Sequence, residues 1–151
     1  MPRRAGAASP RGAGDVRQPV AILLAEDEPD SAILMTQILE IEGYQVVEAR
    51  TGPAALDRLA DAIFDAVLLD VMLPGIDGLE ICRRLRKEER TRDLPVAFLS
   101  ARSREEDRAA GLEAGADVYL TKPISRAALI SAVHFLLDPN RVPRASVRPE
   151  T

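Results

Sequence analysis

The chain has 151 residues, 46% of them hydrophobic and 29% charged, which is enough for one globular domain with an aliphatic core. Its net charge of -4 is uneven: residues 1–19 carry +3 and residues 138–151 carry +1, so residues 20–137 carry -8. Nucleic acid is bound through Lys and Arg at its phosphates, so we expect no nucleic-acid partner for this acidic body and favour a site for a divalent cation.

The two ends of the chain differ in composition from its centre. Residues 1–19 are rich in Arg, Ala, Gly and Pro without an apolar period, which predicts a disordered basic arm. Residues 138–151 place prolines between arginines and predict a flexible Pro/Arg tail, too short for an output domain. We expect residues 20–137 to form one domain that acts as a stand-alone unit.

Nothing in the sequence indicates a membrane or an oxidising compartment. The single cysteine, Cys82, cannot form an internal disulfide. No apolar run approaches the ~20 residues of a membrane span, and no apolar segment follows Arg3 and Arg4 as a signal peptide would require. We therefore expect a cytoplasmic protein with no membrane partner.

Five short apolar runs alternate with longer amphipathic stretches. The runs are residues 20–25, 45–49, 66–69, 96–99 and 118–120. They lack strong polar/apolar alternation, as do parallel strands that are covered on both faces. The pattern predicts a doubly wound α/β fold of the flavodoxin-like (βα)5 type. Its parallel five-stranded sheet should have the order 2-1-3-4-5, because right-handed crossovers then place helices on both faces.

The intervening stretches carry helical signals. Two of them repeat apolar residues at i, i+4 and i+7: Leu34, Ile38 and Ile41 in the first, and Leu129, Val133 and Leu136 in the last. Gly43 is placed to end the first helix, and Asp77 with Glu80 resembles a capping box that opens the third.

Two helical stretches are unusually polar. The basic run at residues 83–87 is predicted to be a solvated helix face. Residues 104–113 contain one large apolar side chain, Leu112, so we expect that helix to be weakly anchored and to be the part that moves.

Polar side chains stand where the predicted strands end, and the carboxyl ends of parallel strands meet at one edge of a sheet. The first strand is followed by Glu26 and Asp27, the third by Asp70, the fourth by Ser100 and the fifth by Lys122. Three carboxylates so close together repel one another unless a cation joins them. Oxygen ligands suit a hard cation, and Mg²⁺ is the natural choice because it leaves places for phosphate oxygens.

This set of side chains is suited to phosphoryl transfer. With the cation bound, Asp70 can act as a nucleophile towards an anionic donor and form an acyl phosphate. The cation, Lys122 and the Ser100 hydroxyl can each bind one oxygen of the phosphoryl group, over which charge spreads during transfer.

Four segments resemble the response-regulator receiver family of two-component signalling: LLAEDEPDS, FDAVLLDVMLPGIDGLEICRRLR, LPVAFLSAR and AGADVYLTKPI. No segment is specific alone, but their order and intervals make an accidental match very rare. The resemblance covers about residues 20–137. It implies a signalling domain rather than an enzyme, one that assists its own phosphorylation and dephosphorylation.

The resemblance also assigns roles at the carboxylate cluster. Asp70 would be the phosphorylation site, and Asp27 would bind Mg²⁺ directly. Glu26, where many relatives have Asp, would bind the ion directly or through water, and the backbone carbonyl of Met72 would be a further ligand. Lys122 would pair with the phosphoryl group, and its peptide bond to the following proline is expected to be cis.

Ser100 and Tyr119 match the family's switch pair. The hydroxyl would move towards the phosphoryl group and the ring would turn inward. That movement would alter the face made by the fourth helix, fifth strand and fifth helix. The implied partners are a sensor histidine kinase or histidine phosphotransfer protein, and a downstream protein target.

Three other functions remain open. A haloacid-dehalogenase-like phosphatase or phosphotransferase would need a second Asp two residues after the nucleophile, where this chain has Met72. A nucleotide- or flavin-binding module would need a glycine-rich loop after the first strand, where the sequence reads AEDE. A phosphorylation-independent interaction module on the same fold is opposed only weakly by the intact site.

Overall fold

The computed structural model describes residues 19–141, so most of the predicted arm and tail lie outside the described residues. The elements are β1 (Ala21–Ala25), α1 (Pro29–Ile41), β2 (Gln45–Ala49), α2 (Gly52–Asp61), β3 (Ala66–Asp70), α3 (Gly78–Lys87), β4 (Val96–Ser100), α4 (Glu105–Ala114), β5 (Val118–Thr121) and α5 (Arg126–Leu137). Within this part of the chain no helix is both long enough and apolar enough to cross a membrane.

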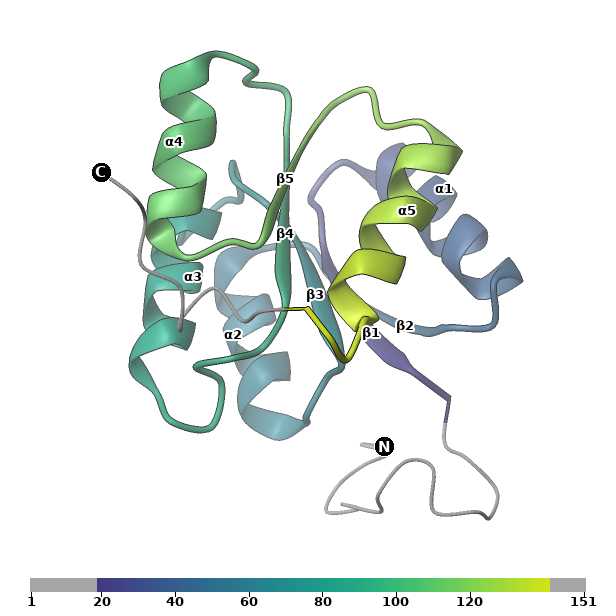
Figure 1. Cartoon of the computed structure of the whole chain (residues 1–151), viewed down its shortest axis with the longest axis horizontal. Coiled ribbons are helices and arrows are strands. Elements are labelled where there is room, and N and C mark those ends of the chain that lie inside the picture. The colour runs from purple at the N-terminus through teal and green to yellow at the C-terminus, as the bar shows by residue number, and fades with distance from the viewer. Residues whose placement is uncertain (1–18, 142–151) are drawn as a thin grey trace.

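The five strands form one parallel sheet in the order β2-β1-β3-β4-β5 (Figure 1). The predicted fold and strand order are therefore confirmed. Strands β1, β3 and β4 are buried along their whole length, which explains why their sequences are apolar without alternation.

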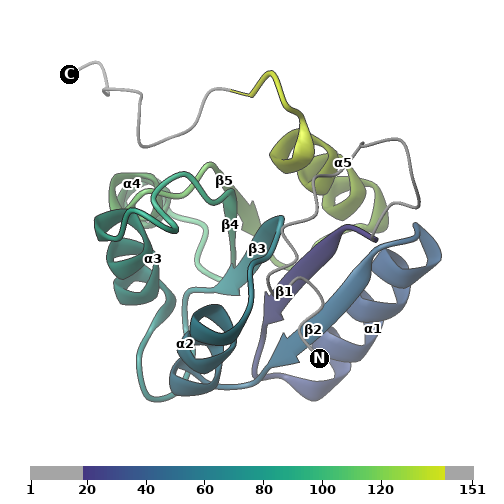
Figure 2. The ribbon, with the colours of Figure 1, turned by 90° about the horizontal axis from the view of Figure 1, so that it is seen from below.

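Helices cover both faces of the sheet, with α1 and α5 on one side and α2, α3 and α4 on the other (Figures 1 and 2). Successive strand residues point to opposite faces. Leu24 and Leu68 therefore join the core beneath α1 and α5, whereas Leu23 and Leu69 join the core beneath α2 and α3. These two clusters of buried side chains pack each face of the sheet against its own layer of helices.

The helix predicted from the spacing of Leu34, Ile38 and Ile41 is present as α1, but only Ile38 of the three packs against the core. Leu34 and Ile41 are 57% and 74% exposed, and the residues that α1 buries are Ala32, Met35 and Leu39. Because α1 carries apolar side chains on more than one face, the packing of the sheet selects which of them is buried. On α5 the predicted residues are buried, which confirms that assignment.

The ends of α1 and α3 follow the predicted signals with one difference. Gly43 follows α1 with φ of +97°, a left-handed conformation that favours glycine. The Asp77 carboxylate accepts a hydrogen bond from the Glu80 backbone N–H at 2.9 Å, so half of the predicted capping box is present. The Glu80 carboxylate binds Arg84 Nε at 3.0 Å instead of completing the box.

The basic run on α3 was predicted to be a solvated helix face. That prediction is wrong for Arg86, which turns inward. Its guanidinium donates to the carbonyls of Gly115 and Leu94, and it forms an ion pair with Asp117 at 3.4 Å. Arg141, near the start of the predicted tail, pairs with the other oxygen of Asp117 at 3.3 Å. These contacts tie α3 to the turn between α4 and β5.

The helix predicted to be weakly anchored has little apolar packing. Its buried residues are the small Gly111 and Ala114, and Leu112 is 36% exposed. The predicted movement of α4 stays a prediction.

Candidate functional site

The carboxyl edge of the sheet brings the predicted site residues together. Asp70 is the last residue of β3, and Glu26 and Asp27 directly follow β1, its neighbour in the sheet. Carboxylate oxygens of the three residues lie within 4.8 Å of one another. Ser100 ends β4, and Lys122 follows β5. The parallel topology thus gathers residues that are far apart in sequence.

Lys122 lies between two of these carboxylates. Its Nζ is 2.8 Å from Asp70 Oδ2 and 2.8 Å from Glu26 Oε1. Burial lowers the pKa of Lys122, but hydrogen bonds to both carboxylates outweigh this effect and hold that pKa above its ordinary value. The lysine is therefore a fixed cation at the position where the carboxylates converge.

The Asp70 carboxylate is held in one orientation. Its Oδ1 accepts a hydrogen bond from the Met72 backbone N–H at 2.8 Å, while Oδ2 contacts Lys122. The side chain is nearly buried, whereas Asp27 beside it is exposed to solvent. One carboxylate is thus oriented by the fold, and a second is open to a ligand from solution.

Glu26 is fully buried, and its two oxygens have different surroundings. Oε2 accepts a hydrogen bond from the Glu28 backbone N–H at 3.1 Å. Apart from the ion pair with Lys122, the buried Oε1 has no partner among the described residues. Burial raises the pKa of the Glu26 carboxyl above its ordinary value, although the Lys122 hydrogen bond opposes the shift. An under-satisfied oxygen beside two further carboxylates fits a hard cation.

The residues of the predicted switch are linked through the backbone of one residue, Arg102. The backbone N–H of Arg102 donates to Ser100 Oγ at 3.0 Å, and the Arg102 carbonyl accepts from the Tyr119 hydroxyl at 2.9 Å. Tyr119 is 8% exposed, so its ring lies inward, while the Ser100 hydroxyl faces the loop. The peptide bond from Lys122 to Pro123 is cis, as expected.

Two residues that contact Tyr119 were not identified from the sequence. The Arg108 guanidinium lies over the ring, 5.5 Å from its centroid. Gly111 faces the ring edge, where no side chain would fit. A glycine within a helix is a sequence signal for close approach and could have drawn attention to Gly111. No comparable signal marks Arg108, since its position depends on how α4 lies against β5.

A shallow hollow of about 380 Å³ borders the site between α1 and the loop that follows β5. It is lined by apolar side chains of Leu34, Met35 and Ile124 and reaches Lys122. The exposed side chain of Ile33 is the neighbour of Leu34 on α1. Apolar surface therefore lies directly beside the charged groups.

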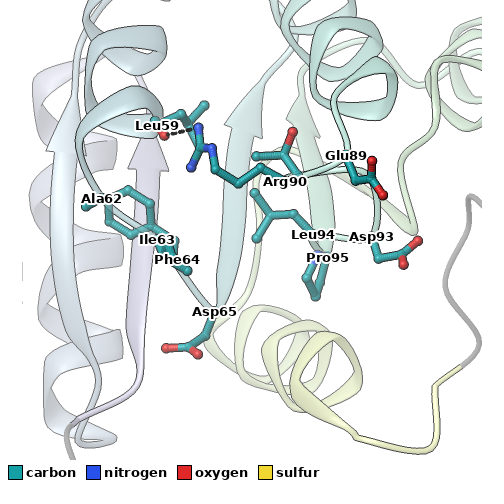
Figure 3. A pocket seen from close by; sticks show the side chains of 11 residues that line it. Leu59, Ala62, Ile63, Phe64, Asp65, Glu89, Arg90, Asp93, Leu94 and Pro95 are labelled. Carbon is teal, nitrogen blue, oxygen red and sulfur yellow. Dashed lines mark hydrogen bonds between the residues drawn. The ribbon is translucent and has the colours of Figure 1, made fainter. Parts of the chain in front are cut away.

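A second cavity, also about 380 Å³, lies at the amino ends of β3 and β4 (Figure 3). Phe64 and Leu94 contribute to its walls, and Arg90 donates to the Leu59 carbonyl at 2.8 Å. Because parallel strands run from this edge to the opposite one, the cavity is remote from the carboxylates.

Comparison with known proteins gives consistent matches. A family model described as the response regulator receiver domain matches residues 22–134. The phosphate regulon transcriptional regulatory protein PhoB of Escherichia coli is 44% identical over 116 residues, covering 77% of this chain and 51% of PhoB. The transcriptional regulatory protein TcrA of Mycobacterium tuberculosis is 43% identical over 141 residues, covering 93% of this chain and 54% of TcrA. The chain spans about half the length of these curated relatives.

Solved structures match the fold as well. The receiver domain of the sensor histidine kinase PA1611 from Pseudomonas aeruginosa PAO1 is 32% identical, with a TM-score of 0.72. The match covers 79% of this chain and 98% of that domain, whose crystal structure has a magnesium ion coordinated in the active site cleft.

Proposed function

The chain belongs to the response regulator receiver domain family, and we propose that Asp70 is the residue on which it accepts a phosphoryl group. The observation that carries the proposal is the Asp70 carboxylate at the end of β3. It is held between the Met72 N–H and the Lys122 ammonium, beside Glu26 and Asp27. Phosphoryl transfer to a carboxylate depends on positioning, and these contacts hold the Asp70 side chain in one orientation.

The proposed reaction transfers the phosphoryl group from a histidine of a donor protein. An oxygen of Asp70 attacks phosphorus, and the new O–P bond forms as the P–N bond breaks. The imidazole leaves with the electron pair of that bond and takes up a proton, and Asp70 becomes an acyl phosphate. Lys122 exchanges its carboxylate contact for a phosphoryl oxygen, and the Ser100 hydroxyl turns from the Arg102 N–H to donate to another.

The residues present fit a magnesium ion. Asp27 and Asp70 would hold it directly, Glu26 would do so directly or through water, and the Met72 backbone carbonyl would be a further ligand. When bound, magnesium supplies positive charge that attracts the anionic donor and the phosphoryl oxygens. The exposed position of Asp27 and the under-satisfied Glu26 oxygen support this assignment.

The proposed donor is a sensor histidine kinase or a histidine phosphotransfer protein. The apolar hollow beside Lys122, with Ile33 and Leu34 exposed on α1, supports a protein donor because such a surface favours protein contact. The proposed readout is the surface of α4, β5 and α5, which a downstream protein would recognise. The site would also assist loss of the phosphoryl group.

Intact-protein mass spectrometry with acetyl phosphate tests the assignment. Wild-type protein should gain one phosphoryl group when magnesium is present and little when the metal is chelated. Asp70→Asn should gain none, and the exposed Asp57→Asn on α2 should behave as wild type. Labelling of Asp70→Asn at another residue would contradict the proposal. Absence of labelling in all proteins would favour a phosphorylation-independent interaction module.

A further inference from the structure

The cavity at the amino ends of β3 and β4, here called the amino-edge cavity, lies between the α2–β3 loop and the α3–β4 loop (Figure 3). Phe64 and Leu94 give it apolar walls, and Ile63, which also lines it, is 53% exposed. Carboxylates lie on both sides, with Asp65 on one loop and Glu89 and Asp93 on the other. The cavity therefore combines apolar surface with negative charge, at the edge of the sheet opposite to Asp70.

Arg141, the last residue that the structure describes, is fixed beside this cavity. Its guanidinium donates to the carbonyl of Asp93, a cavity residue, at 3.4 Å and pairs with the Asp117 carboxylate at 3.3 Å. It also donates to the Leu136 carbonyl at 3.2 Å, and its side chain is only 7% exposed. Residues 142–151 therefore continue the chain from a point that is held close to the α3–β4 loop.

The composition of residues 142–151 complements the amino-edge cavity. The segment reads VPRASVRPET, so Val142, Pro143 and Val147 are apolar while Arg144 and Arg148 are positively charged. An extended chain spans at most about 3.3–3.6 Å per residue, so residues 142–148 can reach about 24 Å, more than the width of a cavity of about 380 Å³. Apolar side chains suit the walls, and arginines suit a border of carboxylates.

The N-terminal segment starts at the same edge of the sheet but complements the cavity less well. The Ala21 N–H donates to Asp65 Oδ2 at 2.8 Å, so residues 1–18 also precede a point beside the cavity. They carry four arginines, but their only valine, leucine or isoleucine is Val16. Residues 142–147 contain two valines and a proline. Because the cavity walls are apolar, these observations favour the C-terminal segment as the occupant.

We propose that residues 142–148 dock in the amino-edge cavity of their own chain. Val142 and Val147 pack against its apolar walls, and Arg144 and Arg148 lie at its carboxylates. The docked segment covers the exposed Ile63 and joins the α2–β3 loop to the α3–β4 loop. This interaction surface goes beyond the proposed function and does not depend on it, because the cavity is remote from the Asp70 site.

Nitrogen-15 relaxation of the full chain tests this proposal by measuring the backbone order of each residue that has an N–H. Residues 144–148 supply five such probes. In wild-type protein their order parameters should be close to the value of about 0.85 that is typical of rigid backbone, whereas a free segment has values below about 0.6. The measurement needs neither magnesium nor phosphorylation of Asp70. The docking can therefore fail while the proposed function stands, and the reverse.

Ile63→Asp adds a charge to the apolar part of the cavity, beside the existing carboxylates. It should release the segment, so the order parameters of residues 144–148 should fall below about 0.6. Ile41→Asp is the matched control, because Ile41 is 74% exposed and lies on α1, across the sheet from the cavity (Figure 2). That variant should leave the order of the segment unchanged.

A second pair of variants changes the segments and leaves the cavity intact. Val147→Asp should release residues 144–148 and shift the amide resonances of Phe64 and Leu94, which line the cavity. Val16→Asp, the same change in the N-terminal segment, should have neither effect. If Ile63→Asp does not fold, as judged by circular dichroism, Val147→Asp decides alone.

Three results would overturn the proposal. One is order parameters below about 0.6 for residues 144–148 in wild-type protein. Another is a shift of the cavity resonances by Val16→Asp and not by Val147→Asp, which would assign the cavity to residues 1–18. The third is an order of the segment that rises with protein concentration, since the occupant would then be the segment of a second copy.

Discussion

Glu26 is a fully buried carboxylate that forms an ion pair with Lys122 through one of its two oxygens. Removing a carboxylate from water is unfavourable, and the ion pair offsets that effect only in part. Burial accordingly raises the pKa of the Glu26 carboxyl. The electrostatic arrangement that suits a metal ion thus reduces the stability of the metal-free protein at neutral pH.

A raised pKa in the folded state means that folded Glu26 binds a proton more tightly than unfolded Glu26. The free energy of unfolding should therefore fall as pH rises from the ordinary value of 4.5 through the raised pKa, and this contribution should level off above it. Glu26→Gln should lack this contribution. Urea denaturation of both proteins in a chelator, at a series of pH values, measures the difference.

Other carboxyl groups titrate in the same range but are common to both proteins. The pKa values of Glu28, Glu48 and Glu80 are lowered by hydrogen bonds, so these groups lose their stabilising effect as pH falls. Their contributions cancel in the difference between wild type and Glu26→Gln. Parallel curves across the whole range would show that Glu26 has no raised pKa.

Among the elements, α3 is linked to the turn that follows α4 through Arg86. Its guanidinium binds carbonyls of the α3–β4 loop and of the α4–β5 turn, and its charge faces Asp117. The side chains of Arg86 and Asp117 are 12% and 4% exposed, so this ion pair is screened little by solvent. One arginine thus connects the C-terminal end of a weakly packed helix to the rest of the fold.

Arg86→Ala should lower the free energy of unfolding by about 2–4 kcal/mol, because the Gly115 and Leu94 carbonyls lose their charged donor and the buried Asp117 loses its ion pair with Arg86. Arg83→Ala is the matched control on the same helix. Its side chain is 49% exposed, and its removal should change stability by less than about 0.5 kcal/mol. Urea denaturation measures both values. Equal losses in the two variants would show that Arg86 is no more important than a surface arginine.

The elements also show how far a sequence can determine this structure. Buried parallel strands are apolar throughout and end in polar residues, so the sheet, its order and the convergence at Asp70 were predictable. The buried face of α1 could not be predicted, because Leu34 and Met35 are adjacent apolar residues and only the packing of the helix on the sheet decides which of the two is buried. Arg86 lies among other basic residues, and which one turns inward depends on the carbonyls of another helix end.

At the scale of the whole molecule, negative charge is concentrated in residues 20–137, which carry -8. Glu26, Asp27 and Asp70 form one group of this charge at the sheet edge, with a single lysine among them. A cation that binds this edge of the folded protein has no equivalent site in the unfolded chain. Binding there should therefore stabilise the entire domain.

Magnesium at about 100 times its dissociation constant should raise the free energy of unfolding by about 2.7 kcal/mol, by mass action on the folded state. Asp27→Asn should lose most of this gain while unfolding like wild type in a chelator, since Asp27 is exposed and is changed to a residue of similar size. The exposed Asp57→Asn on α2 should keep the gain. Denaturation at constant ionic strength separates site binding from general screening. An equal gain in all three proteins would place the bound cation elsewhere, because a ligand can stabilise the folded state only through groups that bind it there.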